Sequence, residues 1–202
     1  MYYINKMNYW GKKDTSVSFC EDNYSNNKYI AEYYNTISGS FYICVALPFL
    51  NTNINHISIC CIFLGIGTIC LHSTQRYYGQ LIDESSMLSL CYLILNKINR
   101  KKYRKEILPL ILVIYIQNYK NFMIFLCIFT VCILLIVNES KNVKTTRKKF
   151  NRNLFLVNMS IGSFLWFLDQ NYCNYVKDYH LHAFWHFFTS VGIASGLTLL
   201  ND

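Results

Sequence analysis

Residues 54–71 read INHISICCIFLGIGTICL, and this stretch decides the fold class. Its apolar side chains surround the helix that they would form, and residues 181–200, LHAFWHFFTSVGIASGLTLL, have the same character. A helix that is apolar on all sides needs either a very large core or lipid around it. A chain of 202 residues offers no very large core. We therefore expect these helices to cross a membrane.

The rest of the chain agrees, because 53% of its residues are hydrophobic and only 15% are charged. Apolar runs alternate with short polar segments. The candidate spans are residues 30–49, 54–71, 81–95, 107–116, 122–137, 154–168 and 181–200. Several are shorter than the roughly 20 residues that a bilayer requires. We expect an all-α protein with one domain, residues 1–202, in which an N-terminal segment, residues 1–29, precedes a seven-transmembrane helix bundle over residues 30–200.

The positive charges set the expected topology. Twelve of the nineteen Lys and Arg residues lie in two blocks without acids, residues 97–105 and 141–152. Basic loops stay in the cytoplasm. Both blocks face the same side only if residues 107–116 and 122–137 are separate helices, so we expect seven spans rather than six. The N-terminus is then lumenal and the C-terminus cytoplasmic.

The net charge of +8 does not indicate a nucleic-acid partner, because no basic stripe alternates with aromatic stacking residues on a polar scaffold. No obligate protein partner is expected either. Seven of the nine cysteines lie in apolar runs, where cysteine behaves as a small hydrophobic residue. Only Cys20 and Cys173 lie outside them.

Three histidines are expected at one depth in the membrane. His182 and His186 are one helical turn apart, so their imidazoles lie on one face. In the seven-span topology, His72 ends the second span on the same side of the membrane. Three nitrogen ligands and a water form a catalytic zinc site. The alternative is that the histidine pair is an ordinary interfacial feature beside Trp185.

A carboxylate and a hydroxyl are expected beside these histidines. Asp83 follows His72 across a short turn and can accept and return a proton. Thr68 precedes His72 by one helical turn and can donate to a developing oxyanion. Two alternatives stay open: Asp83 pairs with Arg76, or Thr68 bonds back to a carbonyl of its own helix.

The segment before the first span also carries acidic and amide side chains. These are Glu21, Asp22, Asn23 and Glu32. Carboxylate and amide oxygens are ligands that calcium takes. The alternative is an acidic segment that is simply solvated.

Four stretches of the chain resemble one family. They are residues 19–38 (FCEDNYSNNKYIAEYYNTIS), residues 67–87 (GTICLHSTQRYYGQLIDESSM), residues 169–173 (DQNYC) and residues 181–186 (LHAFWH). In this order they resemble the alkaline ceramidases, which are seven-span zinc amidases related to the adiponectin and progestin receptors. The resemblance covers nearly the whole chain.

The resemblance assigns roles to the site residues. It implies that His72, His182 and His186 bind Zn²⁺ and that Asp83 and Thr68 serve the reaction. It also implies that Ca²⁺ binds Glu21, Asn23, Glu32 and the backbone carbonyl of Phe19. Two positions depart from the family: Ser18 replaces an aspartate, so calcium should bind more weakly if at all, and Thr68 replaces a serine.

The same resemblance implies hydrolysis of ceramide to sphingosine and a free fatty acid in the endoplasmic reticulum or Golgi. With the N-terminus in the lumen, Cys20 and Cys173 both lie on the oxidising side of the membrane and can form a disulfide. Two other readings stay open. One is a zinc-containing receptor or sensor with little hydrolysis, and the other is a proton-coupled transporter using Asp83, Glu84 and Asp169.

Overall fold

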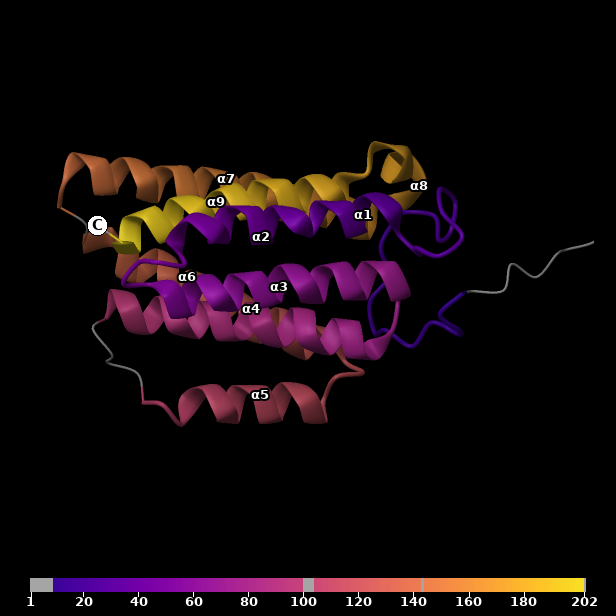
Figure 1. Ribbon diagram of the computed structural model, residues 1–202, viewed down its shortest axis with the longest axis horizontal. Coiled ribbons are helices and arrows are strands. Elements are labelled where there is room, and N and C mark those ends of the chain that lie inside the picture. Colours follow the sequence, from indigo (N-terminus) through magenta and orange to yellow (C-terminus); the bar gives the residue numbers. More distant parts are fainter. Residues whose placement is uncertain (1–8, 100–103, 143, 202) are drawn as a thin grey trace, which may run out of the picture.

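The computed structural model describes residues 9–99, 104–142 and 144–201, and all regular structure within them is helical. The long helices lie side by side in an elongated bundle (Figure 1). The elements are α1 (Tyr33–Ser38), α2 (Ser40–Ala46), η1 (Leu47–Phe49), α3 (Asn55–Thr74), α4 (Tyr77–Ile98), α5 (Ile107–Gln117), α6 (Phe122–Glu139), η2 (Ser140–Asn142), α7 (Thr146–Asn171), α8 (Cys173–Val176), η3 (Lys177–Tyr179) and α9 (Leu181–Asn201). Residues 1–8 of the expected N-terminal segment, parts of both basic blocks and Asp202 lie outside the described residues.

Each candidate span falls on helical structure, although several boundaries were wrong. Residues 30–32 are not helical, and the first span is built from α1, α2 and η1 in succession. Helix α7 begins before the apolar run, because the Thr145 side chain accepts a hydrogen bond from the backbone N–H of Lys148 and so caps a polar first turn. Among the described helices, α3, α6 and α9 are long and apolar enough to cross a membrane, and α5 is a shorter apolar helix.

The prediction that residues 107–116 and 122–137 form separate helices is confirmed. Helix α5 ends at Gln117, and α6 begins at Phe122 after a turn. Asn121 caps α6 by accepting a hydrogen bond from the backbone N–H of Met123 at 3.1 Å.

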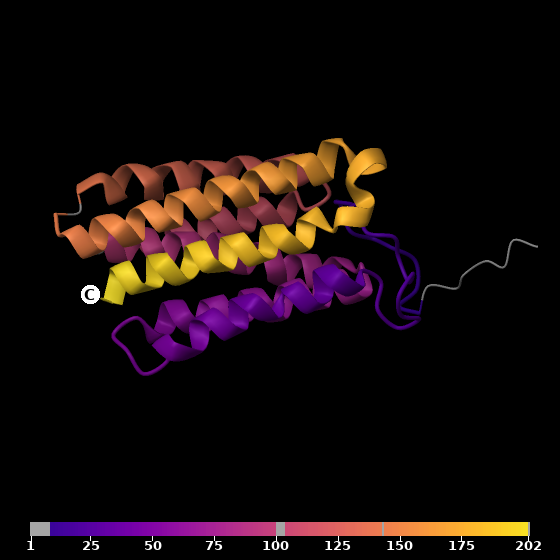
Figure 2. The ribbon, with the colours of Figure 1, turned by 90° about the horizontal axis from the view of Figure 1, so that it is seen from above.

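The two ends of the bundle differ in what they carry. The N-terminal segment, the turn from α3 to α4, and α8 gather at one end, and the end of α9 lies at the other (Figures 1 and 2). The last turn of α4, the first turn of α5, the last turn of α6 and the first turn of α7 lie at the same end of the bundle as the end of α9. The described parts of both basic blocks therefore flank the same end, as the sequence predicted.

Two glycines allow α3 and α4 to pack with their backbones in contact. A Cβ atom added to Gly67 on α3 would lie 2.5 Å from the backbone N of Asp83. One added to Gly79 on α4 would lie 2.6 Å from the backbone N of Leu71. This close approach brings Asp83 beside α3.

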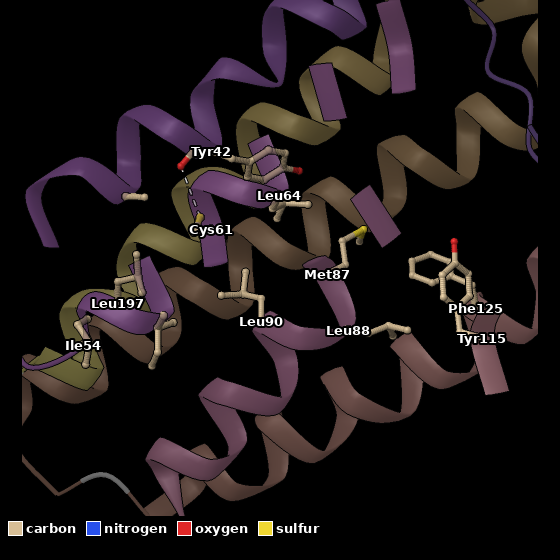
Figure 3. Close-up of a cluster of buried hydrophobic side chains, with 12 residues drawn as sticks. Tyr42, Ile54, Cys61, Leu64, Met87, Leu88, Leu90, Tyr115, Phe125 and Leu197 are labelled. Carbon is tan, nitrogen blue, oxygen red and sulfur yellow. Dashed lines mark hydrogen bonds between the residues drawn. The ribbon is translucent and has the colours of Figure 1, made fainter. Parts of the chain in front are cut away.

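The main apolar core lies between α2, α3, α4 and α9, with Tyr115 and Phe125 reaching it from α5 and α6 (Figure 3). Cys61 is fully buried there, and its Sγ donates to the backbone carbonyl of Tyr42 at 3.4 Å. Its role as a small core residue agrees with the prediction for cysteines in the apolar runs.

Candidate active site

The structure brings His72, His182 and His186 together beneath the N-terminal segment. His72 lies on the last turn of α3, and the other two lie on the first turns of α9. One ring nitrogen from each histidine lies within 4.8 Å of those from the other two. All three side chains are buried. The expected convergence of residues far apart in sequence is therefore present.

Neighbouring side chains orient two of the three rings. The Nδ1 of His72 lies 2.6 Å from Oε2 of Glu32, and the Nδ1 of His186 lies 2.7 Å from Oγ of Ser38. Each contact fixes the orientation of the ring and leaves its Nε2 available to bind a metal ion. A carboxylate or hydroxyl partner of this kind is typical of histidines that bind metal.

The ring of His182 is held by aromatic packing instead. It stacks on Trp185, with ring centroids 5.0 Å apart, and lies 4.0 Å from the ring of Phe19. Neither ring nitrogen of His182 has a hydrogen-bond partner among the described residues. A buried polar nitrogen without a partner is costly, and a metal ion would relieve that cost. Three buried imidazoles in this arrangement could hold a metal ion.

Asp83 and Thr68 contact each other directly. The Oγ1 of Thr68 lies 2.6 Å from Oδ1 of Asp83 and 2.9 Å from the backbone carbonyl of Leu64. The single hydroxyl hydrogen can be donated to only one of these acceptors at a time. When Thr68 donates to Leu64, Asp83 must carry the proton that joins the two side chains. The pair can therefore hold a proton in two arrangements.

The suggested pairing of Asp83 with Arg76 is wrong. The guanidinium of Arg76 lies 2.9 Å from a carboxylate oxygen of Asp14 in the N-terminal segment. Asp83 instead lines a cavity that also reaches His72 and His182.

That cavity has a volume of about 420 Å³ and lies between α3, α4, α6, α7 and α9. His72, His182, Asp83 and Glu84 are its ionisable lining residues. Most of the remaining lining is apolar and comes from α6 and α7. Both its size and its lining are typical of a site for an apolar ligand with one polar group.

The expected calcium ligands already have other partners. The two carboxylate oxygens of Glu21 accept hydrogen bonds from the backbone N–H groups of Tyr34 and Asn35, at 2.8 and 2.9 Å, and so cap α1. Burial raises the pKa of Glu21 despite these two donors. Glu32 contacts His72 and also accepts a hydrogen bond from the Asn35 side chain at 3.0 Å.

The other two residues of the predicted calcium site are Asn23, whose side chain is exposed, and Phe19, which would offer its backbone carbonyl while its ring packs on His72. Calcium takes six to eight oxygen ligands. A calcium ion here would have to share these carboxylates with their present hydrogen-bond donors, and residue 18 is a serine that offers it no carboxylate.

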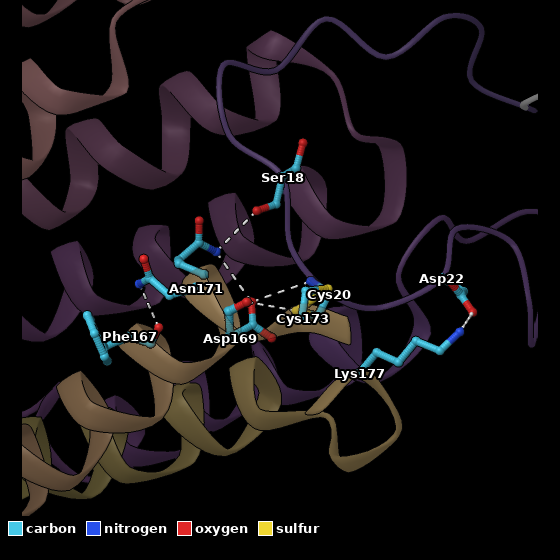
Figure 4. The surroundings of a disulfide bond; sticks show 9 residues. Ser18, Cys20, Asp22, Phe167, Asp169, Asn171, Cys173 and Lys177 are labelled. Carbon is cyan, nitrogen blue, oxygen red and sulfur yellow. Dashed lines mark hydrogen bonds and ion pairs between the residues drawn. A yellow bond between two sulfur atoms is a disulfide. The ribbon is translucent and has the colours of Figure 1, made fainter. Parts of the chain in front are cut away.

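A disulfide fastens the N-terminal segment over the site. Cys20 is joined to Cys173 on α8, with their Cα atoms 5.2 Å apart (Figure 4). The backbone N–H of Cys20 also donates to Oδ2 of Asp169 at 3.4 Å. Beside it, Lys177 and Asp22 form an exposed ion pair at 3.4 Å.

Two contributions were missed at the sequence level. Ser38 carried no signal, because a serine in an apolar run is ordinary and its contact with His186 depends on how α1 and α9 pack. Glu32 was recognised as a polar residue at the right depth, but it was assigned to calcium rather than to His72.

Comparisons with known proteins show the family of the chain. The family model described as Ceramidase matches residues 11–201. An alkaline ceramidase from Arabidopsis thaliana is 29% identical, covering 90% of this chain and 81% of its own. Alkaline ceramidase 3 from Mus musculus is 22% identical, covering 94% and 84%. Alkaline ceramidase YPC1 from Saccharomyces cerevisiae is 24% identical, covering 91% and 75%.

Proposed function

Because the chain belongs to the alkaline ceramidase family, we propose that it is an intramembrane zinc-dependent hydrolase that cleaves the amide bond of ceramide into sphingosine and a free fatty acid. The observation that carries the proposal is the convergence of three buried imidazoles beside the pair of Thr68 and Asp83, at the polar part of an apolar cavity.

His72, His182 and His186 would hold the zinc. A zinc ion bound there would polarise the amide carbonyl and lower the pKa of a water molecule towards neutrality. Glu32 and Ser38 keep two of the rings in position.

Asp83 acts as the general base and then as the general acid. Its carboxylate takes a proton from the attacking water and later delivers it to the amine of the leaving sphingoid base. Thr68 fixes the carboxylate at 2.6 Å and can turn its hydroxyl to the Leu64 carbonyl when Asp83 is protonated. The apolar side chains of α6 and α7 accept the hydrocarbon chains and exclude bulk water.

The bundle would sit in the membrane with α1 and α2 together as its first span, followed by α3, α4, α5, α6, α7 and α9. Large apolar side chains cover its outside, among them Phe63, Leu134 and Phe164, each at least 55% exposed. Basic residues flank the end shared with α9, and this supports a cytoplasmic position for that end and a lumenal position for the site, in the endoplasmic reticulum or Golgi.

The test compares wild-type protein, His182→Ala and His56→Ala, purified in lipid nanodiscs. Fatty acid release from ceramide and bound zinc are both measured. His56 lies exposed on α3 and serves as the matched control. We expect His182→Ala to lose zinc and hydrolysis, whereas His56→Ala keeps both. Unchanged hydrolysis in His182→Ala would refute the zinc mechanism, and a wild-type protein that binds zinc but releases no fatty acid would be a receptor-type member.

A further inference from the structure

The N-terminal segment forms a cover over the site, and the α3–α4 turn and α4 hold it. The backbone N–H of Asp14 donates to the carbonyl of Gln75, and that of Ser16 donates to the side chain of Gln80 at 2.8 Å. Gln170 of α7 donates to the carbonyl of Ser18 at 3.1 Å. Lys13 directly precedes the first of these attachment points.

The ammonium group of Lys13 bonds to another residue of this cover. Its Nζ donates to Oγ of Ser18 at 2.8 Å, and the side chain is partly buried. Burial lowers the pKa of Lys13, while the negative charge of Glu32 raises it. The structure thus places the ammonium group of Lys13 at Ser18, the position of the missing carboxylate.

Ser18 and Glu32 are two of the positions at which the family resemblance predicts a calcium site. Ser18 stands where the family has an aspartate, and it accepts a hydrogen bond from a lysine. Glu21 already caps α1 with both of its oxygens. A calcium ion here would meet one carboxylate fewer and a fixed positive charge that repels it.

We propose that the ammonium of Lys13 takes the place of calcium in this chain, as a covalently attached cation that donates to Ser18 within the N-terminal cover. The enzyme then needs zinc alone. Calcium binding and thermal stability can be measured without any ceramide, so the proposal can fail while the proposed function stands, and the reverse also holds.

The experiment adds calcium chloride to zinc-loaded, calcium-free protein and records the melting temperature, Tm, with binding measured by isothermal titration calorimetry. The wild type is expected to show no binding heat and no change in Tm at millimolar calcium. The double variant Lys13→Ala/Ser18→Asp removes the ammonium and restores the carboxylate. At calcium 100-fold above its Kd, its Tm should rise by about 5–10 °C.

The matched control is Lys12→Ala/Ser18→Asp. Lys12 is exposed, so this protein loses the same charge but keeps Lys13. It should respond less than the Lys13 double variant, because Lys13 pairs with the new aspartate. A wild-type Tm that rises with calcium overturns the proposal, and so does an equal response of the two double variants. The wild-type measurement decides even if a variant does not fold.

Discussion

Replacing Gly67 with alanine is expected to impair hydrolysis without removing the metal. The added Cβ would lie 2.5 Å from the backbone N and 2.7 Å from the Cα of Asp83, whereas ordinary contact begins at 3.4 Å. Helices α3 and α4 must therefore separate locally by about 1 Å. A displacement of this size between catalytic groups typically lowers the rate by about 100-fold. Overpacking of this kind also costs about 1–3 kcal/mol of stability.

The matched control is Gly196→Ala on α9, where the nearest atom to an added Cβ is 3.7 Å away. Both substitutions gain the same intrinsic helix propensity, about 1 kcal/mol, so their difference isolates the contact with α4. The assay measures kcat/KM for ceramide, bound zinc and Tm. Gly67→Ala should keep its zinc, because His72 meets α9 rather than α4. Equal kcat/KM and Tm in the two variants would refute the argument that this glycine positions Asp83.

Three further predictions concern groups around the site. Thr68→Val should lower kcat by about 10-fold to 100-fold, because the variant loses a hydrogen bond to a charged group, which is worth roughly 1.5–3 kcal/mol. Thr68→Ser keeps the hydroxyl and should stay close to wild type. Steady-state kinetics of the two variants would show the difference. Glu32→Gln should weaken zinc binding about 10-fold to 100-fold by removing the carboxylate that orients His72; competition with a chelator measures this, and unchanged affinity would contradict the assigned contact. Cys173→Ser should cost about 2–4 kcal/mol of stability, because it frees the N-terminal segment that the disulfide holds at Cys20. Thermal unfolding with and without reductant tests this. Reductant should lower the Tm of the wild type and leave the Tm of the variant unchanged.

Hydropathy and charge were sufficient to predict where the helices lie. The separation of α5 from α6 followed from the position of the two basic blocks, since a merged helix would have placed them on opposite sides. Helix ends were less predictable. Thr145 starts α7 within a polar stretch that hydropathy cannot recognise as helical, because a cap depends on a local hydrogen bond rather than on apolar character.

The candidate site was predictable where spacing within a helix set the geometry. His182 and His186 share a face through their four-residue spacing, and Thr68 lies one turn before His72 for the same reason. The partners of the rings were not predictable in this way. Ser38 meets His186 only because α1 packs on α9, and the bond from Lys13 to Ser18 depends on how the N-terminal segment folds over the bundle. Such contacts arise from tertiary packing and produce no periodic pattern in the sequence.

The division of the three imidazoles between α3 and α9 also sets the order in which the protein can mature. During translation His72 emerges long before His182 and His186, so the metal cannot find its full set of ligands until α9 has been synthesised and packed against α3. The link from Cys20 to Cys173 waits for the same late stretch of polypeptide. In the proposed zinc site, metal loading would therefore follow the synthesis of α9, and closure of the cover by the Cys20–Cys173 disulfide would follow the synthesis of α8.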